Sequence, residues 1–216
     1  MKPTLLYLQD TLCGWCYGFG PVMQRVQDIW SDRVDIQVMA GGMVVGERVG
    51  TVGDRVEVLR DAYRRIEEST GAVFGTAYVG GVLEEGTAIL DSVPGAKALM
   101  TFKTFDPERA VDFAHRLQQA IYRDGMSIVD DGTFAALAEE YGLDVDEFLT
   151  TLHDEQIAVM VDEEFAFVSS MGISGFPTVI LIKDDQAMIL AEGYATYEEM
   201  EFRLDLALKA FDQSRN

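Results

Sequence analysis

The 216-residue chain contains only two cysteines, Cys13 and Cys16, in a Cys-Gly-Trp-Cys motif just after the apolar run Leu5 to Leu8. An unbroken apolar run predicts a buried strand, and we expect a helix from the motif to about Trp30. Cys13 then lies at a helix N-terminus, where unpaired N–H groups and the helix dipole stabilise a thiolate. The motif predicts a redox dithiol in which Cys13, the more exposed and more acidic thiol, attacks and Cys16 resolves.

Other uses of the cysteine pair fit the sequence less well. A structural zinc site needs four ligands, and the two histidines, His115 and His153, do not have the spacing of a zinc finger. A structural disulfide across so short a loop would constrain the unfolded chain little. Two inert buried thiols are the remaining alternative. We therefore expect a redox pair, with no metal and no cofactor.

Composition limits the partners and the compartment. With 48% apolar residues and five prolines, the chain is typical of a packed globular protein. No apolar run approaches the ~20 residues of a membrane span, and the N-terminus does not resemble a secretory signal. We therefore expect a cytoplasmic protein. The net charge of −20 argues against nucleic-acid and anionic membrane partners.

The order of predicted elements indicates an α/β fold. The first strand and helix lead to a second strand in which Val34, Ile36 and Val38 alternate with polar residues. After residue 154 we expect a helix, a strand over Thr178 to Ile182, a returning strand over Ala187 to Ala191 and a final helix. The order β-α-β followed by α-β-β-α is that of the thioredoxin fold.

Residues 51–154 show almost no strand pattern. Apolar stripes such as Val56, Leu59, Tyr63 and Ile66 predict four or five helices in this segment. We therefore expect a discontinuous thioredoxin-like domain, residues 1–50 and 155–216, with an all-helical insertion domain over residues 51–154.

A second motif, Gly172-Ile-Ser-Gly-Phe-Pro-Thr178, directly precedes the third strand. Because proline lacks an N–H, Pro177 suits the first position of a strand on structural grounds alone. In the thioredoxin fold, however, this loop faces the redox cysteines. A cis bond before Pro177 would present the backbone of Phe176 to an incoming peptide.

With both motifs and the helical insertion, the chain resembles the DsbA-like thioredoxin-fold disulfide oxidoreductases, in particular the FrnE-like cytosolic subgroup. The resemblance implies that Cys13 is the nucleophile, Cys16 the resolving thiol and Pro177 the cis-proline. It implies protein or peptide thiols and disulfides as substrates, with glutathione or a thioredoxin-type system recycling the pair. Gly14, Trp15, Phe176 and Pro177 would form the substrate-binding surface.

The sequence departs from the family at two points. Gly14-Trp15 replaces the Pro-His dipeptide of the strongly oxidising members, which removes one source of thiolate stabilisation. The buried acid of thioredoxins falls here on Tyr7. Asp10 is the nearest carboxylate and is either a proton acceptor for Cys16 or a loop-capping residue.

Two further function classes share these features. Kappa-class glutathione transferases and hydroxychromene-carboxylate isomerases also insert helices into a thioredoxin core, but use a serine at the position of Cys13. A non-catalytic redox sensor is the third class. We expect His115 at the surface or at the boundary of the core, His153 at a helix end, and Gly41-Gly42 as a strand exit rather than a site of substrate approach.

Overall fold

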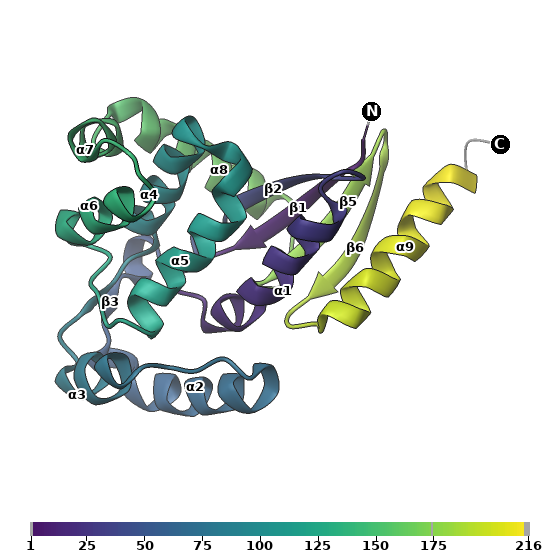
Figure 1. Cartoon of the computed structure of the whole chain (residues 1–216). Coiled ribbons are helices and arrows are strands. Elements are labelled where there is room, and N and C mark those ends of the chain that lie inside the picture. Colours follow the sequence, from purple (N-terminus) through teal and green to yellow (C-terminus); the bar gives the residue numbers. More distant parts are fainter. Residues whose placement is uncertain (1, 174, 214–216) are drawn as a thin grey trace.

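The computed structural model describes residues 2–173 and 175–213; Ser174 of the second motif lies outside them. A four-stranded mixed sheet has the order β2-β1-β5-β6 (Figure 1). Its strands are β1 (Thr4–Gln9), β2 (Asp35–Ala40), β5 (Thr178–Lys183) and β6 (Gln186–Glu192). β1 runs parallel to β2 and antiparallel to β5, and β5 and β6 form a hairpin. The predicted thioredoxin fold is confirmed.

Both faces of the sheet are covered by helices. Leu5 and Tyr7 of β1 pack in the same cluster as α1 (Gly14–Trp30) and α9 (Tyr197–Gln213). Leu6 and Leu8 point the other way, into a cluster with α8 (Glu155–Ser170). Successive strand residues face opposite sides, so a strand covered on both faces is apolar throughout. This explains the unbroken run that the sequence shows before the cysteines.

The segment between β2 and α8 is mainly helical, as expected. Its longer helices are α2 (Val56–Thr70), α4 (Ser92–Phe105), α5 (Ala110–Tyr122), α6 (Asp131–Glu140) and α7 (Val145–Leu152). Short helical turns lie at Gly46–Arg48, Gly53–Arg55, Tyr78–Val82, α3 (Leu83–Glu85) and Pro107–Arg109. The strands β3 (Gly50–Thr51) and β4 (Ile89–Leu90) were not expected. Two residues are too few to show a strand periodicity.

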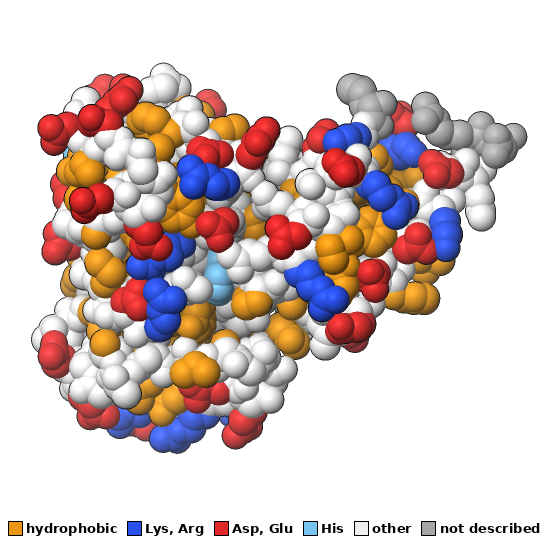
Figure 2. Space-filling view, viewed as in Figure 1, with side chains coloured by type: hydrophobic (Ala, Val, Ile, Leu, Met, Phe, Trp, Pro, Cys, Tyr) orange, Lys and Arg blue, Asp and Glu red, His pale blue; other side chains and the backbone are white. Residues whose placement is uncertain are grey.

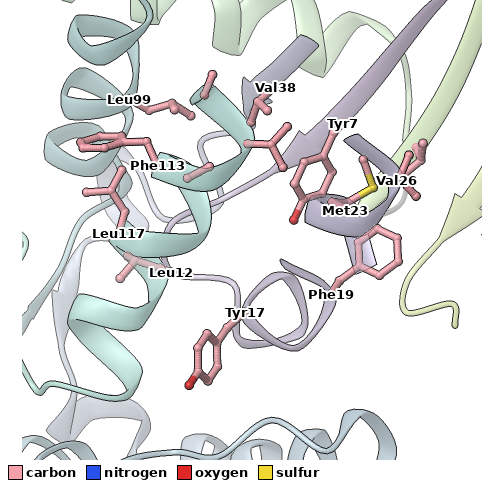
Figure 3. Close-up of a cluster of buried hydrophobic side chains, with 14 of the residues drawn as sticks. Tyr7, Leu12, Tyr17, Phe19, Met23, Val26, Val38, Leu99, Phe113 and Leu117 are labelled. Atoms are coloured by element: carbon pink, nitrogen blue, oxygen red, sulfur yellow. The ribbon is translucent and has the colours of Figure 1, made fainter. Parts of the chain in front are cut away.

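The helical segment shares its core with the sheet. Leu99 of α4 and Phe113 and Leu117 of α5 belong to the same buried cluster as Tyr7 and Phe19 (Figure 3). α5 lies along α1, so the helix that begins at the cysteines is packed between the sheet and the insertion (Figure 1). The division into two domains at residues 51–154 stays our prediction.

The edge strand β2 is held by a partly buried ion pair, in which the Glu164 side chain is buried and that of Lys103 is 22% exposed. Glu164 of α8 accepts a hydrogen bond from the Ala40 N–H at 2.7 Å, and Lys103 of α4 donates to the Val38 carbonyl at 3.1 Å. The two side chains pair with each other at 2.6 Å. Backbone groups of an edge strand need such partners when helices cover them.

Acidic and basic side chains are interspersed over the face shown in Figure 2. Within residues 2–173 and 175–213, no helix is long and apolar enough to cross a membrane.

Candidate active site

The two cysteines lie where β1 ends and α1 begins. Cys13 is the N-cap residue of α1, and its sulfur accepts a hydrogen bond from the Cys16 N–H at 3.2 Å. The Cys13 N–H donates to the Asp10 carbonyl at 3.1 Å, which closes a tight turn before the helix. Both cysteines are free thiols. The sulfur of Cys13 therefore takes the capping position that the sequence predicted, where backbone donors favour negative charge.

Both thiols are buried. Cys13 is 4% exposed and Cys16 is 0% exposed, so Cys13 is the more exposed of the two, by a small margin. Next to the thiols, α2 packs closely on two glycines of α1. A Cβ at Gly14 would lie 2.7 Å from Cδ1 of Ile66, and one at Gly18 would lie 2.6 Å from Oγ1 of Thr70. Gly14 thus permits close packing of α2; its role in substrate binding stays a prediction.

The environment behind the dithiol keeps Cys16 protonated. Burial raises the pKa of the Cys16 thiol well above its usual value, and the adjacent Cys13 sulfur raises it further. Tyr7 stands where thioredoxins have a buried acid, and burial raises its pKa as well. The Tyr7 hydroxyl has no hydrogen-bond partner within the described residues. Tyr7 is therefore a neutral phenol beside the cysteines and takes no proton from Cys16.

Phe176 of the second motif contacts Cys13 of the first. The Cys13 sulfur donates to the carbonyl oxygen of Phe176 at 3.4 Å, and the Phe176–Pro177 peptide bond is cis. Pro177 is buried and directly precedes β5, whose pairing with β1 brings the two motifs together. Trp15 is half-buried against the main core. Its place in a substrate-binding rim with Phe176 and Pro177 stays a prediction.

Gly41 and Gly42 leave room for the aromatic rings of Phe176 and Phe165. A Cβ at Gly41 would lie 1.8 Å from Cζ of Phe176, and one at Gly42 would lie 3.0 Å from the Phe165 ring. Gly42 also has a φ of 64°, which favours glycine. The pair is therefore more than an exit from β2, because it fixes the ring of the residue whose carbonyl contacts Cys13.

Asp10 holds the turn together. Its carboxylate accepts hydrogen bonds from the Leu12 N–H at 2.9 Å, the Met43 N–H at 2.8 Å and the Ser92 hydroxyl at 2.9 Å. Burial raises the pKa of the carboxyl, while these donors lower it. Both carboxylate oxygens of Asp10 therefore already accept hydrogen bonds. A role as proton acceptor for Cys16 stays a prediction.

The expectation that His115 lies at the surface or at the boundary of the core was wrong, because the residue is buried. His115 is 5% exposed and stacks on Tyr17, with ring centroids 5.7 Å apart. Its ring fits against Gly20, where a Cβ would lie 2.0 Å from Nδ1. Burial lowers the pKa of His115 to about 4. His153 lies at the end of α7, as expected, and contacts Asp131 at 2.8 Å.

No group of three or more His, Cys, Asp or Glu side chains in the described part of the chain is arranged to hold a metal ion.

Two residues at the turn were missed by the sequence analysis. Gln118 of α5 donates to the Asp10 carbonyl at 3.3 Å, and the Tyr122 hydroxyl donates to the Leu12 carbonyl at 2.5 Å. The available signal was a row of polar side chains at helical spacing on α5, His115, Gln118 and Tyr122. Only the fold shows that this face meets the turn carrying Cys13.

Known proteins resemble the chain over nearly its whole length. The cytosolic disulfide reductase DsbM from Pseudomonas aeruginosa superposes with a TM-score of 0.81 at 27% identity, covering 96% of this chain and 98% of that one. DsbM has also been solved with glutathione. A 2-hydroxychromene-2-carboxylate isomerase superposes with a TM-score of 0.64 at 14% identity, covering 98% of this chain and 97% of that one, which shows the fold alone.

A curated relative is the ClpXP adapter protein SpxH of Halalkalibacterium halodurans, 24% identical over 91% of this chain. The chain spans 65% of the length of that relative. The profile of the DSBA-like thioredoxin domain family matches residues 5–201. This match includes both cysteines and the Phe176–Pro177 motif, so the chain belongs to the DSBA-like thioredoxin domain family.

Proposed function

We propose that this protein is a thiol–disulfide oxidoreductase that exchanges disulfides with protein or peptide substrates through Cys13 and Cys16. The observation that carries the proposal is the position of the Cys13 sulfur. It caps α1 and lies 3.4 Å from the Phe176 carbonyl. A nucleophilic thiolate at a helix N-terminus, beside a backbone acceptor for an extended peptide, is the arrangement that such exchange needs.

In the proposed reaction the Cys13 thiolate attacks one sulfur of a substrate disulfide. The substrate S–S bond breaks, its other sulfur leaves as a thiolate, and a mixed disulfide with Cys13 forms. Cys16 then gives its proton to the substrate thiolate released in the first step and attacks the Cys13 sulfur, which breaks the mixed disulfide. The second substrate thiolate leaves, so the substrate is reduced and the pair is oxidised to a disulfide. The raised pKa of Cys16 keeps it out of the first step, and its complete burial has the same effect.

An external thiol must return the pair to its reduced form. We propose a cytoplasmic reductase that is recycled by glutathione or a thioredoxin-type system. The similarity to DsbM, a cytosolic disulfide reductase solved with glutathione, supports this direction of electron flow. Compartments kept reducing by glutathione favour a resting dithiol.

The test is reduction of insulin by dithiothreitol with the purified protein as catalyst. We expect catalysis by the native chain and none by Cys13→Ser. Cys16→Ser should accumulate mixed disulfides with substrate thiols, visible on non-reducing gels, because the resolving step is missing. His153→Ala, an exposed residue at the end of α7, serves as the control and should keep full activity.

Two other outcomes would point to the alternative classes. Conjugation of glutathione to an aromatic electrophile that does not need Cys16, without insulin reduction, would indicate a transferase or isomerase. Inactivity in both assays, with a pair that still switches reversibly, would indicate a redox-controlled binding module. The similarity to SpxH, an adapter protein, makes that second candidate worth measuring.

A further inference from the structure

The helical insertion supplies two hydrogen-bond donors to the turn that carries Cys13. Gln118 and Tyr122 lie one turn apart on α5 and therefore on one face. The two residues are 1% and 5% exposed. Gln118 donates to the carbonyl of Asp10 and also, at 2.8 Å, to the side chain of Gln9. Tyr122 donates to the carbonyl of Leu12.

Both carbonyls belong to the turn that leads into Cys13. The Asp10 carbonyl accepts the Cys13 N–H, and the Leu12 carbonyl belongs to the peptide group that contains this N–H. A carbonyl oxygen is the negative end of a dipole, and the turn is buried, so its field is screened little. Without the side-chain donors, the partial negative charge on each oxygen would oppose a thiolate on Cys13 more strongly. A donor on each oxygen reduces that opposition and fixes the position of the turn.

Tyr122 remains a donor throughout the working pH range. Burial raises the pKa of its hydroxyl well above the usual value. Its ring is also held, packing edge-on against Phe74 and Tyr78 with centroids 5.1 Å apart in each case. Removing the hydroxyl alone would therefore leave the aromatic packing in place.

We propose that Gln118 and Tyr122 are positioning residues that stabilise the Cys13 thiolate and thereby set the reduction potential of the dithiol. The helical insertion then tunes the chemistry of a motif that lies outside it. This inference rests on the proposed function for its redox pair. Because a stabilised thiolate stabilises the reduced form, losing either donor should make the pair a stronger reductant.

The test uses Tyr122→Phe and Gln118→Leu. Each is made with Cys16→Ser, and the Cys13 thiolate is titrated by its ultraviolet absorbance against a Cys13→Ser blank. We expect each variant to lower the thiolate fraction near neutral pH roughly threefold. In the chain with both cysteines, equilibration with a glutathione redox buffer should shift the dithiol–disulfide equilibrium by a similar factor, about 14 mV to more negative potential.

Tyr141→Phe and Gln119→Leu are the matched controls. Tyr141 donates to Asp112 at 2.6 Å, and Gln119 contacts the His115 ring at 3.0 Å, so neither touches the turn. Both should leave the titration and the potential unchanged. A folded Tyr122→Phe protein with the native titration and potential would overturn the inference, even if Gln118→Leu did not fold. Failure of insulin reduction by the native chain would count against the proposed function only, because the titration does not depend on turnover.

Discussion

The sulfur of Cys13 lies 3.4 Å from the carbonyl oxygen of Phe176, although 163 positions separate the two residues in sequence. The central pairing of β1 with β5 produces this contact, since each motif sits at the end of one of these strands. The reactive sulfur and the backbone that would receive a peptide are therefore fixed by the same sheet.

We predict that iodoacetamide at neutral pH modifies Cys13 before Cys16. Cys16 is completely buried and its pKa is raised, so neither access nor ionisation favours it. Peptide mapping by mass spectrometry of briefly treated protein gives the order. Earlier modification of Cys16 would reverse the assigned roles.

Gly41→Ala should slow disulfide exchange roughly tenfold to hundredfold, because the added methyl displaces the Phe176 ring and with it the carbonyl beside Cys13. Overpacking of this kind also costs about 1–3 kcal/mol of stability. Stopped-flow reaction with a small disulfide measures the rate. Gly80→Ala, where a Cβ meets nothing within 4 Å, is the control and should react like the native protein. If Gly41→Ala and Gly80→Ala reacted at the same rate, packing of the Phe176 ring on Gly41 would not be positioning the carbonyl beside Cys13.

His115 should make the protein less stable as the pH falls from about 6.5 towards about 4. Its pKa is lowered by burial from 6.5 to about 4 in the folded chain, so the unfolded chain binds the proton first. The stabilisation is complete above the unfolded pKa and is lost through this window, by at most about 3 kcal/mol. Burial raises the pKa of Asp10, so this residue instead makes the folded chain more stable as the pH falls. Urea unfolding of the native protein and of His115→Gln at several pH values isolates the contribution of the histidine. If the free energy of unfolding changed with pH in the same way in both proteins, His115 would not be the cause.

Lys103→Met should lower the free energy of unfolding by about 3 kcal/mol, because it leaves the Glu164 carboxylate buried without its cation. Thermal or urea unfolding measures the change. Lys209→Met breaks an exposed i,i+4 pair with Asp205 and should cost less than about 1 kcal/mol. If the two losses were equal, the Lys103–Glu164 pair would not be holding β2.

Local patterns predicted the elements well, and the pairing of distant elements explains what they missed. The strand before Cys13, the helix to Trp30 and the final helix follow from periodicity and spacing, and the structure has all three. The burial of His115 depends on the absence of a side chain at Gly20, on another helix. Such a complementary fit leaves no trace in the sequence around either residue.

At the site, the sequence reveals the local motifs but not the contacts between distant helices. The two motifs could be recognised because each is short and contiguous. The close packing of α2 and the donors on α5 could not, because they depend on how two distant helices approach the start of α1. Glycines at positions 14 and 18 were compatible with several kinds of close approach.

The central strand of the sheet is the first to be synthesised, whereas its partner β5 begins only at Thr178. At typical synthesis rates, roughly 10 to 30 s pass between the emergence of the cysteines and that of the strand that completes the site. During this interval we expect both thiols to lie open to oxidants and to other nascent chains. Until β5 has formed, the dithiol lacks the burial that covers both thiols in the completed fold.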